Sequence, residues 1–141
     1  MADEKRNLNV YTVIHSDDDT DNLFLQTDCE ISGTEDDYTV KYNDTSGDMK
    51  NCETLLHITS GKKVTVNRNG EHKSFIILEK DIRHKARHRT PQGDFSMGVL
   101  CEEIKSDFEK GKLFFSYRTD IDRTPVGKIE FTFDFGKSKE I

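Results

Sequence analysis

Apolar residues recur at every second position along most of the chain, and polar residues occupy the positions between them. This spacing is typical of β-strands that bury one face. The clearest runs are Val64 and Val66; Phe95, Met97 and Val99; Leu113, Phe115, Tyr117 and Ile121; and Ile129, Phe131, Phe133 and Phe135. Turn signals separate the runs. The pattern predicts about ten strands, near residues 8–15, 22–32, 37–43, 53–59, 62–68, 72–79, 82–90, 94–104, 112–121 and 126–135.

The short connections predict how these strands are arranged. A long antiparallel meander with one buried face tends to curl and close, because closure removes its exposed edges. We therefore expect an all-β fold, a closed or nearly closed antiparallel up-and-down barrel of about eight to ten strands.

Arg68-Asn69-Gly70-Glu71 predicts a hairpin with a two-residue primed turn. Residues 101–110 are either strand or a short helical turn, since Ile104 and Phe108 stand four apart among glutamates and lysines.

The chain of 141 residues fits one domain, with residues 1–7 and 137–141 as frayed termini. Three widely spaced cysteines form no zinc pattern and are expected to be reduced thiols. The charged N-terminal stretch does not resemble a signal peptide, and no apolar run is long enough to span a bilayer. We expect a cytoplasmic protein with no membrane partner. The oligomeric state is left open.

Charge is distributed unevenly along the chain. Residues 17–53 hold twelve acids against two bases, whereas residues 61–90 hold nine bases against three acids, although the net charge is -6. We expect these segments to lie side by side and neutralise each other.

The stretch IRHKARHRTPQG, residues 82–93, is the most basic part of the chain. On a strand, Arg83, Lys85, Arg87 and Arg89 project from one face, which we expect to face solvent because burying four cations is costly. This stripe is either a hydrated surface or a site for an anionic partner such as RNA or an acidic protein surface. The acidic overall charge, and the lack of aromatic residues between the basic positions, weigh against nucleic acid.

Two stretches of the chain resemble metal-binding motifs. His84 and His88 could share a zinc ion on a helix, but on a strand they stand about 13 Å apart. They are better interpreted as half-buried polar residues on the inward face. Residues 17–21, DDDTD, begin like a calcium loop, yet Asn22 replaces the required glycine and Asp28 the bidentate glutamate. We predict no metal and no other cofactor.

Residues 89–121, RTPQGDFSMGVLCEEIKSDFEKGKLFFSYRTDI, resemble the YwiB-like family of bacterial proteins of unknown function, as does the earlier VNRNG. The similarity extends from about residue 8 to residue 135. It implies a calycin-like, or lipocalin-like, β-barrel and brings no established activity. The family often has an aromatic residue two positions before the Thr-Pro step, where this chain has His88.

Two functions follow as hypotheses. The first is a binding protein that holds a small molecule in the barrel interior or at one mouth, with Arg68, His84, His88 and Tyr117 as its polar groups. Arg118 replaces Arg68 if the register is wrong. The abundant phenylalanines of the last two strands can instead fill the interior. The alternative is an interaction module that uses the basic stripe. We predict no catalytic residues, and an enzyme ranks third.

Overall fold

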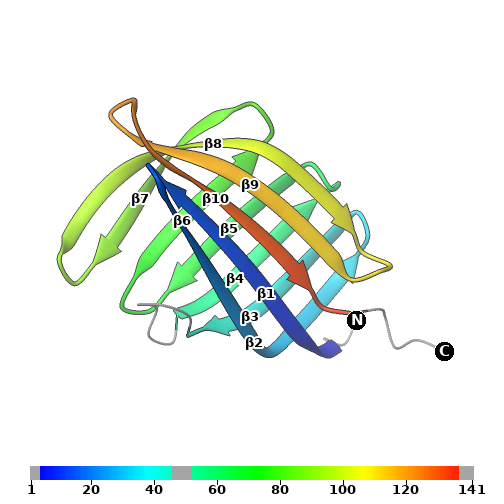
Figure 1. The fold of residues 1–141 in the computed structure, drawn as a ribbon. Coiled ribbons are helices and arrows are strands. Elements are labelled where there is room, and N and C mark those ends of the chain that lie inside the picture. The colour runs from blue at the N-terminus through cyan, green and yellow to red at the C-terminus, as the bar shows by residue number, and fades with distance from the viewer. Residues whose placement is uncertain (1–3, 46–51, 137–141) are drawn as a thin grey trace.

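The computed structural model describes residues 4–45 and 52–136, and every regular element in them is a β-strand (Figure 1). The ten strands are β1 (Glu4–Ser16), β2 (Asp19–Thr34), β3 (Asp37–Asp44), β4 (Cys52–Thr59), β5 (Lys63–Asn69), β6 (Lys73–Glu79), β7 (Arg83–Thr90), β8 (Gly93–Asp107), β9 (Lys112–Ile121) and β10 (Thr124–Asp134). Each matches a predicted strand. None of the described residues belongs to a helix that could cross a membrane.

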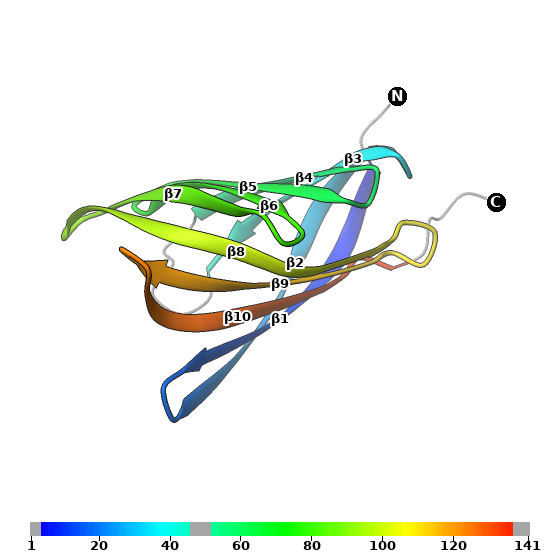
Figure 2. The same ribbon diagram turned by 90° about the horizontal axis from the view of Figure 1, so that it is seen from above.

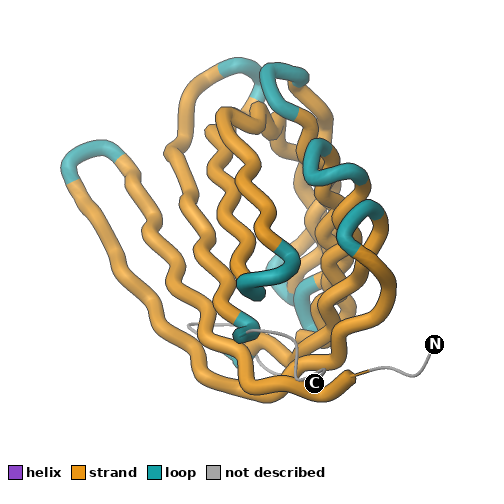
Figure 3. The backbone as a smooth tube through the Cα atoms, turned by 90° about the vertical axis from the view of Figure 1, so that its right-hand side faces the viewer, coloured by secondary structure: helices purple, strands orange, loops and turns teal. Residues whose placement is uncertain are grey.

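The strands form one closed antiparallel barrel in which each strand pairs with its neighbours in sequence, and β1 closes the circle by pairing with β10. This confirms the predicted up-and-down barrel. Figure 3 shows the strands wrapped around a common interior and joined by short loops. Because the sheet is closed, every strand position points either into the barrel or away from it.

The helical alternative for residues 101–110 is wrong. β8 stays paired with β9 as far as Asp107↔Lys112, and its register shifts between Cys101 and Glu103. This bulge brings Cys101 and Ile104 to the same face, opposite the inward Tyr117 and Phe115, although they are three residues apart. The bulge therefore produces an apolar spacing that resembles a helix.

The hairpin at Arg68-Asn69-Gly70-Glu71 is confirmed, but its predicted two-residue turn is wrong. Arg68 pairs with Ser74, and Asn69 remains in β5, where it pairs with Glu53 of β4. The connection is therefore residues 70–72. Pairing with β4 keeps Asn69 extended, so it cannot take the positive φ that a primed turn requires.

Aromatic rings fill much of the interior. Phe115, Phe131 and Phe133 pack with ring centroids 5.3 to 5.8 Å apart, and Tyr117 lies 6.3 Å from Phe131. All four side chains are at most 7% exposed. Burial of so much apolar surface is the main source of the barrel's stability.

The beginning and end of the barrel lie together. Residues 4–7 are part of β1 rather than frayed: Arg6 is 5% exposed and donates a hydrogen bond of 3.0 Å to the carbonyl of Gly136. Its guanidinium also lies 5.6 Å from the centre of the Phe135 ring. Residues 1–3 and 137–141 lie outside the described residues.

The opposite end is the wider one, and we call it the mouth. It carries the β1–β2, β5–β6, β7–β8 and β9–β10 turns, and the β1–β2 and β7–β8 hairpins diverge there (Figure 2). The inward face of these hairpins ends in apolar side chains that are only half covered: Ile14, Leu23, Phe95, Met97 and Ile121. Phe95 is 44% and Ile121 50% exposed. The mouth therefore presents an apolar rim around the barrel interior.

One seam in the wall is less complete than the others. β6 pairs with β7 through Lys73↔Arg89, Ser74↔His88 and Phe75↔Arg87 only, and an isolated bridge joins Glu79 to Ile82. Between these contacts, residues 76–78 of β6 face residues 84–86 of β7 without pairing in the ladder of the two strands.

We predict that the amides of residues 76–78 and 84–86 that point toward this seam exchange with solvent faster than those between β8 and β9. Without ladder partners they open locally instead of requiring unfolding of the barrel. Native-state hydrogen exchange followed by NMR should show a difference of at least about tenfold, equivalent to about 1.4 kcal/mol of opening free energy. Equal protection at both seams would contradict this.

Candidate functional site

A positively charged side chain, Arg68 of β5, points into the barrel close to the mouth. It shares the inward face with the buried Val64 and Val66, as its position in the alternation predicts. Its neighbours across the strands are Thr54 of β4 and Ser74 of β6, which are 0% and 8% exposed. Arg68 itself is half-buried.

The contacts of Arg68 leave part of its hydrogen-bonding capacity unused. Its guanidinium carbon lies 5.7 Å from the centre of the Phe131 ring, a cation–π contact. Its Nε is buried without a hydrogen-bond partner among the described residues, and so is the hydroxyl of Tyr42. Buried polar atoms are normally satisfied, and leaving one unpaired costs about 1–3 kcal/mol.

The surroundings keep the guanidinium charged. Burial is the largest single influence and opposes the charge, but Tyr42, Tyr117 and Asp44 together raise the pKa of Arg68 above its ordinary value. Burial raises the pKa of Tyr42 and of Tyr117, and Arg68 opposes the rise in both. Both phenols therefore remain neutral and able to donate hydrogen bonds near a fixed cation.

His88 of β7 extends this group toward the mouth. Its cross-strand neighbour is Ser74, and its ring stacks on Phe95 with centroids 5.1 Å apart and planes 11° from parallel. Burial lowers the pKa of His88, and the nearby Arg68 lowers it further. His88 is therefore neutral at pH 7. We call Arg68, Tyr42, Tyr117 and His88 the Arg68 cluster.

The structure brings three of the four predicted ligand-binding residues together. Arg68, His88 and Tyr117 lie in the Arg68 cluster, whereas His84 is separate and shares a hydrogen bond of 3.0 Å with Glu79. Arg118, the substitute for Arg68, is exposed and donates to Glu102 at 2.8 Å.

Sequence reasoning missed Tyr42. Its inward direction could be read from alternation with Tyr38 and Val40, but its proximity to Arg68 depends on the pairing Tyr42↔Thr54↔Arg68 across three strands.

The basic stripe faces outward, as predicted, with Lys85, Arg87 and Arg89 exposed. The four cations of the stripe are not all free. Arg83 donates two hydrogen bonds to Asp120, of 3.0 and 2.7 Å, and Arg89 forms an ion pair of 3.5 Å with Asp94.

These contacts do not join residues 17–53 to residues 61–90, although Asp44 of the first segment attracts Arg68 of the second and helps to raise its pKa. The partner of Arg89 comes from β8, which pairs with β7, and the partner of Arg83 comes from β9, the next strand beyond β8. The ion pairs of Lys41 and His84 stay within one segment, and those of Arg83 and Arg89 lead outside both.

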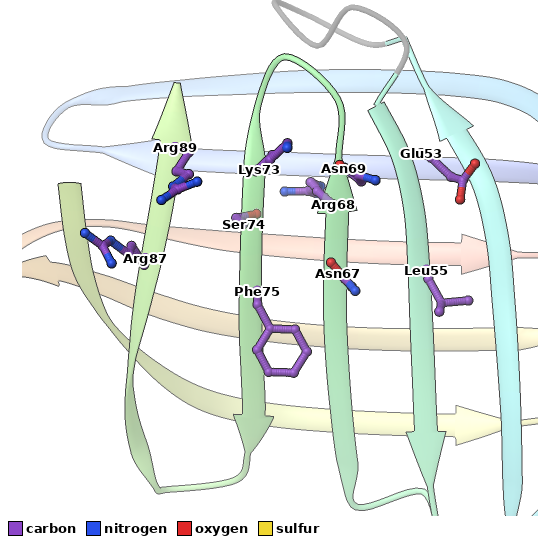
Figure 4. A pocket seen from close by; sticks show the side chains of 10 residues that line it. All are labelled: Glu53, Leu55, Asn67, Arg68, Asn69, Lys73, Ser74, Phe75, Arg87 and Arg89. Atoms are coloured by element: carbon purple, nitrogen blue, oxygen red, sulfur yellow. The ribbon is translucent and has the colours of Figure 1, made fainter. Parts of the chain in front are cut away.

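An open groove of about 360 Å³ crosses the outer face of β4 to β7 (Figure 4). The outward side chains that line it are Glu53, Leu55, Asn67, Asn69, Lys73, Phe75, Arg87 and Arg89; the inward residues Arg68 and Ser74 also border it. Phe75 is 49% exposed. Sequence analysis did not place an aromatic residue beside the basic stripe, because Phe75 lies next to Arg87 only through the β6–β7 pairing.

Other chemistry is not assembled by the described part of the chain. No three histidine, cysteine, aspartate or glutamate residues there are grouped as metal ligands. Cys29, Cys52 and Cys101 are free and buried, and burial raises the pKa of Cys29 and of Cys101 to about 11. The thiols of Cys29 and Cys101 are therefore protonated and weakly nucleophilic. The DDDTD stretch forms the β1–β2 hairpin tip.

We predict that Arg68→Met leaves the folded state as stable as the wild type or more stable, by about 0–2 kcal/mol. Methionine keeps most of the apolar contact and removes a buried, unsatisfied donor. Phe131→Ala serves as the comparison and should lose about 3–5 kcal/mol by creating a cavity. Urea unfolding measures both. A loss above about 2 kcal/mol in Arg68→Met would show that the arginine is there for stability.

We predict that His88 titrates below its ordinary pKa of about 6.5 and that Arg68→Met moves this pKa upward. The unfolded chain binds this proton more readily than the folded one, so His88 costs stability as pH falls below about 6.5. Replacing it in His88→Gln removes that component. Histidine NMR titrations measure the pKa, with Arg118→Met as a control that leaves it unchanged. An unshifted His88 pKa in Arg68→Met would contradict the proximity of the two groups.

The comparisons with known proteins agree with this architecture. A family model described as "Domain of unknown function (DUF1934)" matches residues 8–133. The crystal structure of the ywiB protein from Bacillus subtilis is similar, with a TM-score of 0.75 and 18% sequence identity over 96% of this chain and 94% of that one. At this identity the likeness concerns the fold. No curated protein matches significantly. Since the family model spans nearly the whole barrel, the chain belongs to the DUF1934 family, the YwiB-like proteins of unknown function.

Proposed function

We propose that the protein binds a small amphiphilic acid at the mouth of the barrel. One observation carries this proposal: a charged arginine lies inside a barrel next to the hydroxyl of Tyr42, and neither its Nε nor that hydroxyl has a well-formed hydrogen bond among the described residues. A carboxylate or phosphate supplies acceptor atoms for such donors and a charge opposite to that of Arg68. Binding sites typically combine a few such polar groups with an apolar lining.

The apolar part of the ligand packs against the rim of the mouth. Phe95 and Ile121 are about half exposed on the inward face, and the stacked pair of His88 and Phe95 offers a flat wall next to Arg68. The deeper interior is occupied by Phe131, Tyr117 and their neighbours. The ligand therefore lies at the mouth, with its acidic group directed toward Arg68, rather than in the centre of the barrel.

Neutral His88 and the two neutral phenols suit binding rather than proton transfer at pH 7. The phenols have a raised pKa and do not release their protons near neutrality. We propose a binding protein that acts in the cytoplasm, where three buried, free cysteines stay reduced.

Dodecanoate and dodecyl phosphate are suitable ligands for a test, and dodecanol is the matched neutral molecule. At a concentration about a hundredfold above Kd, a ligand adds about 2.7 kcal/mol to stability and raises Tm by several degrees. We expect this rise with either acid in the wild type and in Arg118→Met. It should be lost in Arg68→Met, which folds normally. A rise with dodecanol equal to that with the acids, or a full rise in Arg68→Met, would refute the proposal.

A further inference from the structure

The outer groove of β4 to β7 combines an exposed aromatic ring with unpaired cations on a flat sheet face. The register places Leu55, Asn67, Phe75 and Arg87 side by side on four neighbouring strands. Figure 4 shows Phe75 between Asn67 and Arg87 in this row. Adjacent members of such a row stand about 4.5–5.5 Å apart, so one planar ligand can touch Phe75 and its two neighbours, Asn67 and Arg87.

A second row runs beside the first and adds charge. It contains Lys73 and Arg89, which pair across β6 and β7. Among the described residues Lys73 and Arg87 form no ion pair, whereas Glu53 is held by Lys41 at 3.7 Å and Arg89 by Asp94 at 3.5 Å. Two free cations therefore flank Phe75 on a protein whose net charge is -6.

We propose that this groove binds a short single-stranded nucleic acid, with a base stacked on Phe75 and the adjoining phosphates on Arg87 and Lys73. Every base has a flat face that stacks on an exposed aromatic ring, and single-stranded binding sites pair such rings with a positive groove. The Asn67 side chain, with both a donor and an acceptor, lies where it can meet a base edge.

The composition of the groove distinguishes this partner from an acidic protein surface. Carboxylates would engage the cations but would leave the half-exposed face of Phe75 without a function. The acidic remainder of the protein repels a long polyanion, so contact is restricted to the few nucleotides that the groove accommodates. Phe75, Arg87 and Lys73 point away from the barrel interior, whereas Arg68, which borders the groove, points into it, so the two proposals rest on different side chains.

Fluorescence anisotropy with a short labelled oligouridylate tests the proposal. We expect binding at about 50 mM salt that weakens toward about 200 mM, with a log–log slope near -1.4 for two phosphate contacts, at about -0.7 per contact on single strands. Phe75→Ala should weaken binding at least about tenfold. Arg87→Gln should weaken it and reduce the slope by about 0.7.

The matched controls lie elsewhere on the outer face. Phe24 of β2 is 55% exposed, and Arg118 is exposed, so Phe24→Ala and Arg118→Gln remove the same side chains outside the groove. We expect both controls to bind like the wild type.

Several results would overturn the proposal. These are no binding by the wild type at low salt, unchanged binding in Phe75→Ala, or an equal loss in Phe24→Ala. Displacement of the oligonucleotide by polyglutamate, with no effect of Phe75→Ala, would identify an acidic protein surface instead. Complete displacement by uridine monophosphate at concentrations near the Kd of the oligonucleotide would identify a mononucleotide site.

Discussion

Closure of the sheet is the constraint on which the rest of this structure depends. Once β1 pairs with β10, each strand has two neighbours and each residue has one fixed side. A shift of one residue in any strand would turn its whole apolar set to solvent. The aromatic interior and the closed register therefore stabilise each other, and the polar residues that point inward do so because the register leaves them no alternative.

Arg68 is one of the places where the closed barrel departs from the rule that interiors are apolar, as are Arg6 and Asp44. The pKa of Arg68 is raised above its ordinary value in spite of burial, and its Nε lacks a well-formed hydrogen bond, which adds a further cost. Stability alone does not explain such a residue, since an apolar side chain of similar size would fill the same space. Residues that lower the stability of the fold without a compensating structural contact are concentrated at functional sites. The half-covered apolar rim around Phe95 lies next to Arg68, as the proposed binding of an amphiphilic acid requires.

The outer face of the barrel is set by the same alternation of side chains, but it carries exposed cations instead of buried apolar groups. Alternation sends Arg83 and Arg87 outward together, yet their surroundings differ completely: Asp120 of β9 binds the first, while Phe75 of β6 lies beside the second. Within one basic stripe of the sequence, Arg83 thus forms an ion pair while Arg87 remains a free cation beside an aromatic ring. Neighbours across the strands, rather than neighbours along the chain, decide the role of each cation.

The sequence by itself determined the ten strands, their up-and-down order and the side on which most residues lie, because a period of two is a local property of the strand. It also placed Arg68, His88 and Tyr117 on the inward face. Only the tertiary structure decided that these three meet Tyr42, that His84 joins Glu79 instead, and that residues 101–110 absorb a bulge. Contacts between strands depend on register and closure, which arise from pairings between residues far apart in the chain and leave no local pattern.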